Sequence, residues 1–217
     1  SFQKALLQAS NLVDQSPDRL VTFGIRPSNP SSSYGYIQQG ETLPHKKDDA
    51  PVHRVAQFRE KPPVDIAKEY LAAGTFLWNA GIFVWRAKTI INALAEHQPA
   101  CLEHLRRIAD NWETPQRNEV FSEEFAAIKA VSIDYAVLEH AAEVAVIEAP
   151  FTWDDLGGWS AVARQRGHDE NGNTVVGRHL GIDSKNVLVH TCDDHLIVTL
   201  GLENTLLVHT DDATLVA

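Results

Sequence analysis

The sequence predicts an α/β domain followed by a small all-β extension. In the longer first part of the chain, β-rich runs alternate with helical patterns, which is typical of layered α/β folds with at least some parallel strand pairing. From Gly167 onward, short apolar runs are separated by turn residues and carry no helical pattern. We therefore expect two domains, residues 1–165 and residues 166–217, and a hydrophobic content of 44% in 217 residues allows a sizeable core.

The elements of the first domain follow in order from local patterns. Apolar residues at helical spacing predict an opening helix that begins near Phe2. Prolines and glycines bound the later elements, and Gly74 is a typical helix stop. The expected strands are residues 20–25, 34–38, 52–58, 75–85 and 144–149. The expected helices are residues 64–73, 87–97, 99–110, 119–128 and 132–140.

The extension contains about five short strands with a weak internal repeat. Residues 186–190 and 205–209 read alike when their terminal histidines, His190 and His209, are placed together. This spacing is too irregular to predict a solenoid from the sequence alone.

Composition limits the classes of partner. The chain has 29 acidic and 19 basic side chains, and a net charge of −10 argues against a nucleic acid or an anionic membrane as the main partner. The two cysteines, Cys101 and Cys192, stand far apart without companions at metal-ligand spacing, so we expect reduced thiols and a cytoplasmic location. No apolar run approaches the ~20 residues that span a bilayer.

Glu60 and Lys61 lie where a predicted strand gives way to a loop. Binding groups are commonly placed at such strand ends, and an ammonium fixed by the following Pro62 can hold a phosphate. The alternative is an ordinary surface charge pair, which would be the preferred interpretation if this motif stood alone.

Two glycine motifs flank this position in the sequence. Asn79 and Gly81 interrupt an apolar strand, which indicates either a binding role or a β-bulge with a satisfied amide. Gly35, between Tyr34 and Tyr36, either lets the backbone approach a ligand or is an ordinary glycine at the start of a strand.

Paired aspartates between two tryptophans form the last motif. Asp154 and Asp155 repel each other unless a cation compensates them, and the glycines at 157 and 158 form a turn before a helix. The alternative is that one aspartate caps that helix. For Ser132 and Asp134 we prefer the capping interpretation, with the serine as N-cap and the aspartate in the first turn.

In this order and spacing, the four motifs resemble those of the sugar-1-phosphate nucleotidyltransferases, most closely the bacterial mannose-1-phosphate guanylyltransferases. Those enzymes make GDP-mannose from GTP and mannose-1-phosphate, and the resemblance covers nearly the whole chain. It implies a Rossmann-like, GT-A-like nucleotidyltransferase domain that is incomplete at its N-terminus, with a β-helix-like extension that supports a homodimer.

The resemblance also implies roles for particular residues. Lys61 would bind the sugar phosphate, and Asp155 would hold Mg²⁺ or another divalent cation, so these two carry the catalytic role. We expect Lys61 and the cation on Asp155 to meet across one cleft. The residues implied in substrate binding are Gly35, Glu60, Lys61, Asn79 and Gly81. Four positions depart from the family pattern: Ser32 and Ser33 replace threonine and glycine, Ala80 is the small residue after Asn79, and Asp154 stands where serine is common.

The family's nucleotide-binding loop, rich in glycine, does not occur in these residues. The chain also lacks methionine and opens within a helical pattern, so we expect a nucleotide-binding part before Ser1 and no transfer by this chain alone. The expected function is transfer of GMP from GTP to mannose-1-phosphate, giving GDP-mannose and pyrophosphate. The alternatives are a non-catalytic sugar-phosphate-binding or assembly module, and a nucleotidyltransferase for another sugar-1-phosphate.

Overall fold

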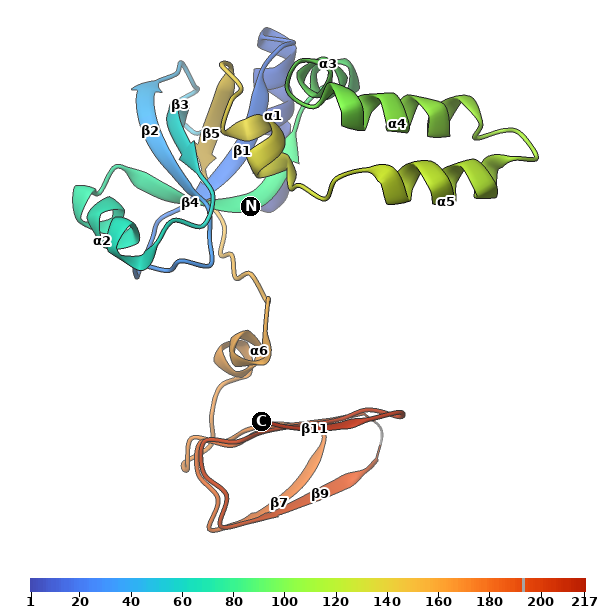
Figure 1. Cartoon of the computed structure of the whole chain (residues 1–217). Helices are drawn as coiled ribbons and strands as arrows, with labels where there is room; N and C mark the ends of the chain where they lie inside the picture. Colours follow the sequence, from blue (N-terminus) through green and yellow to red (C-terminus); the bar gives the residue numbers. More distant parts are fainter. Residues whose placement is uncertain (193) are drawn as a thin grey trace. The chain divides into compact units, whose positions relative to one another are not determined.

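A computed structural model describes residues 1–192 and 194–217, which form two compact units, Ser1–Trp153 and Asp154–Ala217 (Figure 1). This division by contacts falls before the last helix, whereas the boundary expected from the sequence falls after residue 165. Among the described residues, no helix has the length and apolar character needed to cross a membrane.

The first unit is built from strands and helices that alternate along the chain. Its strands are β1 (Leu20–Ile25), β2 (Tyr36–Thr42), β3 (Val52–Arg59), β4 (Phe76–Val84) and β5 (Val144–Glu148). Its helices are α1 (Phe2–Gln15), α2 (Val64–Ala73), α3 (Ala87–His97), α4 (Pro99–Asp110), α5 (Arg117–Ala127) and the π-helix η1 (Asp134–Leu138). The predicted elements are therefore confirmed, with ends that move by a few residues. Gly74 ends α2 in the left-handed region, as a helix stop should.

The five strands of the first unit close on themselves in the order β1-β4-β2-β3-β5. β1 and β5 run parallel, with Leu20 opposite Val144, and the other described pairs of this sheet are antiparallel. The expectation of an α/β domain with some parallel pairing is confirmed. The same closure brings β2 between β3 and β4, and this arrangement decides where the functional side chains meet.

Two apolar clusters hold this sheet. Helix α1 buries Ala5, Ala9 and Leu12 against Val21 and Phe23 on the outer face of β1. On the inner face, side chains of all five strands pack together with η1. This inner cluster comprises Leu20, Ile37, Phe58, Leu77, Ala136, Val137, Leu138, Val144 and Val146. Full burial of each such side chain contributes about 1.5–3 kcal/mol, so η1 is fixed firmly over the sheet.

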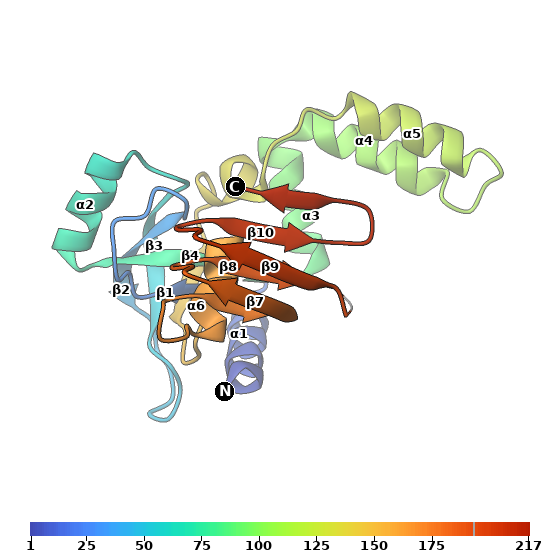
Figure 2. The ribbon, with the colours of Figure 1, turned by 90° about the horizontal axis from the view of Figure 1, so that it is seen from below.

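The second unit begins with α6 (Trp159–Arg166) and continues as stacked strands (Figure 2). Its strands are β6 (Thr174–Val176), β7 (Arg178–Ile182), β8 (Leu188–Thr191), β9 (Leu196–Leu200), β10 (Leu206–His209) and β11 (Thr214–Val216). β6, β8 and β10 are parallel neighbours in one sheet, β7 and β9 are parallel in a second, and β11 closes the first sheet antiparallel to β10. The chain therefore winds as a short parallel β-helix.

The repeat read from the sequence is wrong by one residue. The structure pairs Leu188 with Leu206 and Thr191 with His209, so His190 and His209 are not equivalent. The corners set the register: Asn186 and Asn204 both adopt positive φ, of 53° and 51°, and the Asn186 amide donates to Asn204 Oδ1 at 3.3 Å. Asparagine tolerates this left-handed conformation better than other residues with side chains, so stacked asparagines mark equivalent positions more reliably than apolar strings do.

Candidate functional site

Three neighbouring strands place Gly35, Glu60 and Asn79 side by side. Gly35 directly precedes β2, Glu60 directly follows β3, and Asn79 lies within β4. Tyr36 pairs antiparallel with Arg59 on one side and with Trp78 on the other, so the residue before Tyr36 lies on one row with the residues after Arg59 and Trp78. The Asn79 N–H donates to the Gly35 carbonyl at 2.8 Å. The structure therefore brings together residues that lie up to 44 positions apart in the sequence (35 to 79).

Glu60 is a buried acceptor without a partner. Its side chain is only 9% exposed, and Oε2 has no hydrogen-bond partner among the described residues. A methyl group on Gly35 would overlap this oxygen, so only glycine leaves the carboxylate its place. Burial is the main cause that raises the pKa of Glu60, the negative charge of Asp134 adds to the effect, and Lys61 opposes it.

Lys61 presents its ammonium beside this carboxylate. Its Nζ lies 3.5 Å from Glu60 Oε1 while the side chain is 58% exposed, so the charge remains available to a second anion. The backbone of Lys61 has a φ of +44°, an uncommon conformation for a residue with a side chain. Non-glycine residues held in this region cost about 1–3 kcal/mol and cluster at functional sites.

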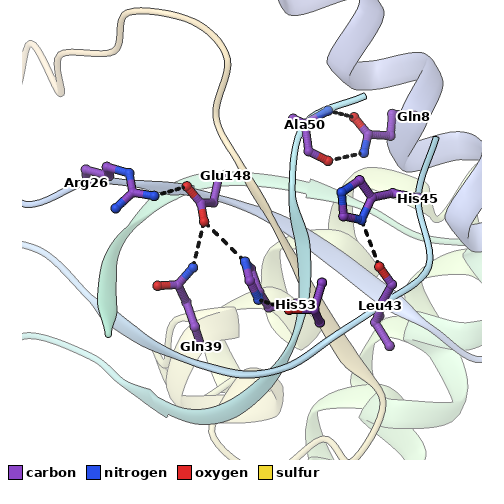
Figure 3. A network of polar contacts seen from close by, with 9 residues as sticks. Gln8, Arg26, Gln39, Leu43, His45, Ala50, His53 and Glu148 are labelled. Atoms are coloured by element: carbon purple, nitrogen blue, oxygen red, sulfur yellow. Dashed lines mark hydrogen bonds and ion pairs between the residues drawn. The ribbon is translucent and has the colours of Figure 1, made fainter. Parts of the chain in front are cut away.

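A second buried carboxylate in the same unit shows what a fully partnered group looks like. Glu148, 15% exposed, accepts from Arg26 at 2.6 Å, Gln39 at 2.9 Å and His53 at 3.1 Å (Figure 3). These donors compensate the free-energy cost of removing the Glu148 carboxylate from water. The cluster therefore has a structural role at the end of β5. Glu60 has comparable burial, but its Oε2 has no such donor among the residues that the structure describes.

Asn79 sits in a β-bulge, which confirms the local structure that the sequence left open. The pairing of β1 with β4 shifts between Thr22 and Gly24, and Gly81 takes a φ of +67°. Asn79 Oδ1 accepts from the Thr22 hydroxyl at 3.1 Å and from the Gly81 N–H at 3.2 Å, and Nδ2 donates to Asp134 Oδ1 at 3.0 Å. A methyl group on Gly81 would meet open space, which is consistent with room for a ligand there. Contact of Asn79 with a sugar stays a prediction.

Helix η1 and the residue after it contact Asn79 and Glu60, although the sequence analysis gave this segment no role in the site. The N-cap of η1 is Ile133 and makes no side-chain capping bond, so the Ser132 cap was wrong, and Asp134 bonds Asn79. Glu139 Oε1 accepts from the Glu60 N–H at 3.0 Å, and the Tyr135 hydroxyl donates to the Glu60 carbonyl at 3.4 Å. Local capping rules explained Ser132 and Asp134 without a ligand, so the sequence analysis did not assign this segment to the site.

Asp155 lies in the second unit, in the loop before α6. It is exposed, and a methyl group on Gly157 would come within 3.0 Å of its Oδ2. The N-cap position of α6 is Gly158, so neither Asp154 nor Asp155 is the N-cap residue of this helix. Lys61 belongs to the other unit. That Lys61 and a cation on Asp155 meet across one cleft therefore stays a prediction.

The fold and the gathered motifs define a protein of the nucleotidyltransferase class. The family model described as nucleotidyl transferase matches residues 2–172, and a model described as mannose-phosphate isomerase/GMP-like β-helix domain matches residues 177–217. The chain belongs to the nucleotidyl transferase family, with its Rossmann-like α/β domain and β-rich C-terminal region, and the expected β-helix-like extension is confirmed.

Individual relatives are similar over nearly the whole chain. The xanthan biosynthesis protein XanB of Xanthomonas campestris pv. campestris (strain B100) is 36% identical over 220 residues, which is 100% of this chain and 44% of the relative. A mannose-1-phosphate guanylyltransferase of Klebsiella pneumoniae is 36% identical over 99% of this chain and 45% of its own length. One of Escherichia coli (strain K12) is 35% identical over 92% of this chain and 41% of its own length.

Solved structures show the same fold. The crystal structure of a mannose-1-phosphate geranyltransferase from Thermus thermophilus superposes with a TM-score of 0.78 at 30% identity, covering 100% of this chain and 60% of that one. A mannose-6-phosphate isomerase from Helicobacter pylori, at 24% identity and a TM-score of 0.57, shares the fold over 71% of this chain and 57% of its own. The chain spans less than half the length of the curated relatives described above.

Proposed function

We propose that this chain supplies the sugar-phosphate-binding part of a mannose-1-phosphate guanylyltransferase, which transfers GMP from GTP to mannose-1-phosphate and releases pyrophosphate. The observation that carries the proposal is the Glu60 carboxylate, whose Oε2 is buried without a partner among the described residues beside the exposed ammonium of Lys61. A buried acceptor costs about 1–3 kcal/mol when unsatisfied, so a ligand hydroxyl that donates to it gains affinity.

The paired charges suit the two ends of a sugar phosphate. Glu60 accepts from sugar hydroxyls, and Lys61 binds the phosphate as a compact cation. In the reaction, an oxygen of the sugar phosphate attacks the α-phosphorus of GTP, the new P–O bond forms, and the bond to the leaving pyrophosphate breaks. A phosphate monoester with a second pKa of about 6 is largely dianionic at neutral pH, so the attack needs no general base. Positioning and charge neutralisation by Lys61 are the contributions of this chain.

Asp155 fits a divalent cation that binds mainly through its substrate. Mg²⁺ usually takes one or two carboxylates together with phosphate oxygens and waters, and Asp155 offers one exposed carboxylate in a glycine-bounded loop. The described residues contain no group of three or more potential metal ligands. When bound, Mg²⁺ or another divalent cation would offset charge on the phosphates.

We further propose a homodimer in the cytoplasm. The face of β7 and β9 exposes apolar residues on alternate positions, with Leu180 paired to Val198 and Ile182 to Leu200, and an apolar sheet face of this kind favours association. Both cysteines are free thiols, which suits a reducing compartment. Analytical ultracentrifugation tests the dimer, and a monomer throughout the micromolar range would contradict it. Cell fractionation tests the location.

Calorimetric titration with mannose-1-phosphate tests the proposed function. The parent chain should bind, and Lys61→Ala should weaken binding roughly 10- to 100-fold, because a hydrogen bond to a charged group contributes about 1.5–3 kcal/mol and each tenfold is 1.36 kcal/mol. Lys68→Ala is the matched control, since Lys68 is a similarly exposed lysine that pairs with Asp65 on α2. No heat with the parent chain, or equal affinities for the two variants, would refute the proposal.

A further inference from the structure

Asp134 is a residue of the site region to which the proposed function gives no role. It is the first residue of η1, and its Oδ1 accepts from Asn79 Nδ2 at 3.0 Å across 55 positions of sequence. A carboxylate in the first turn of a helix is usually explained by that helix. Here the Asp134 carboxylate bonds a residue of another element, β4, so we relate its role to Asn79.

The bond to Asp134 completes a network that allows only one orientation of the Asn79 amide. The oxygen of Asn79 receives the Gly81 N–H and shares the Thr22 hydroxyl with the Ile82 carbonyl. The nitrogen faces a carboxylate, which can only accept when ionised. A flipped amide would place its NH₂ against the Gly81 N–H and its oxygen against Asp134. Of the two amide hydrogens, one goes to Asp134 and the other meets no acceptor among the described residues, so it is the donor that a ligand can use.

Asn79 and Glu60 border the same small space. The Asn79 Cβ would lie 3.3 Å from a methyl group on Gly35, and the same methyl group would overlap Glu60 Oε2. The side chains of Asn79 and Glu60 therefore both start beside the bare Cα of Gly35, one carrying the fixed amide donor and the other the buried acceptor. Of two adjacent hydroxyls on a sugar ring, one can accept from an amide while the other donates to a carboxylate.

The charge of Asp134 also bears on Glu60. The pKa of Glu60 is raised chiefly by burial, next by the charge of Asp134 and least by that of Glu139, while Lys61 lowers it. Tyr135 contributes only its hydroxyl, to the Glu60 carbonyl. A more basic carboxylate is a stronger hydrogen-bond acceptor, so Asp134 strengthens the acceptor as well as fixing the donor.

We propose that Asp134 is a positioning residue of the sugar site, holding the Asn79 amide so that two adjacent sugar hydroxyls meet one fixed donor and the Glu60 carboxylate. This inference rests on the proposed function, because it concerns the same ligand and site. It adds that recognition depends on a pair of neighbouring hydroxyls, and that η1 is part of the site.

The test compares three variants by calorimetric titration with mannose-1-phosphate between pH 5 and pH 8, without divalent cations. Asp134→Ala removes the acceptor and should weaken binding about 10-fold. Asp134→Asn keeps an acceptor for Asn79 and should stay within about 3-fold of the parent at pH 8. It should also move the acid limb of the binding profile to lower pH, because Glu60 loses its charged neighbour. Glu139→Gln is the matched control, since it neutralises a nearby carboxylate that does not bond Asn79.

The outcomes separate the inference from the proposed function. If the parent chain does not bind, the proposed function fails. If the parent binds and Asp134→Ala binds equally well, the positioning role is refuted while the proposed function stands. Should Asp134→Ala fail to fold by its thermal unfolding curve, Asp134→Asn decides: a pH profile that moves no more than that of Glu139→Gln refutes the inference.

Discussion

Glu148 and Glu60 are two buried carboxylates on one sheet, and they differ in what surrounds them. Glu148 is held by Arg26, Gln39 and His53, so it receives a donor from three separate segments (Figure 3). Glu60 has the Lys61 ammonium beside Oε1, whereas its Oε2 has no hydrogen-bond donor among the described residues. The carboxylates of Asp134 and Glu139 lie near it. Burial alone therefore does not separate a structural acid from a binding acid. The supply of donors does, because an uncompensated buried carboxylate is costly unless a ligand completes it.

The strongest way to break this comparison is to fill the space beside Glu60. Gly35→Ala should reduce mannose-1-phosphate binding about 100-fold, because the new methyl group displaces the Glu60 carboxylate, while the unfolding free energy falls by only about 1 kcal/mol since a flexible side-chain end can move. Calorimetry and denaturant unfolding measure the two effects. Gly158→Ala is the control, because a methyl group there meets nothing within 4 Å and its φ is −171°. Equal binding by Gly35→Ala and the parent would show that the pocket is elsewhere.

A matched pair of substitutions should change stability in opposite directions. At pH 8, Glu60→Gln should raise the unfolding free energy by about 1 kcal/mol, because it removes a buried charge whose Oε2 has no donor among the described residues. Glu148→Gln should lower it by about 1–2 kcal/mol, because its new NH₂ group faces donors from Arg26, Gln39 and His53.

The pH dependence of this pair follows from the raised pKa of Glu60. In the parent chain, the contribution of Glu60 to the unfolding free energy is fully present below the ordinary glutamate pKa of 4.5. This contribution is lost as pH rises through the higher pKa of the folded state. The advantage of Glu60→Gln should accordingly shrink as pH falls toward 4.5. Thermal unfolding across this range measures it, and a gain that is constant with pH would contradict the assignment.

The smallest effect on stability is expected at Asp155, which sharpens the comparison with a third carboxylate. Asp155→Asn should change the unfolding free energy by less than about 0.5 kcal/mol because the side chain is exposed, and should leave cation-free binding of mannose-1-phosphate unchanged. It should remove the gain that Mg²⁺ gives to mannose-1-phosphate binding in calorimetry. Asp154→Asn serves as the neighbouring control. Loss of cation-free sugar-phosphate binding with Asp155→Asn would argue against a metal role.

Local patterns predicted the elements of the fold well. Helix α2 has the predicted ends, because Pro63 precedes it and Gly74 adopts the left-handed stop that only glycine reaches easily. The register of the β-helix was not predictable in the same way. Apolar strings align at several offsets, whereas the Asn186–Asn204 bond fixes one.

The site was predicted in part, for an equally physical reason. Gly35, Glu60 and Asn79 were recognised from their motifs, and strand pairing brings them together. The place of Asp134 in the first turn of its helix was predicted, but its bond to Asn79 was missed, because that bond spans 55 positions and a capping rule considers only local partners. The hydrogen bonds of Glu139 and Tyr135 to the Glu60 backbone likewise join distant segments, which no rule about neighbouring residues reveals.

The left-handed backbone at Lys61 has a consequence for how this protein would change under selection. Glycine is the residue that suits a φ of +44° best, yet the position carries a long cationic side chain. A mutant library screened for heat resistance alone would therefore enrich glycine at 61 and discard the ammonium. Any effort to evolve a hardier form of this protein must screen for ligand affinity in every round.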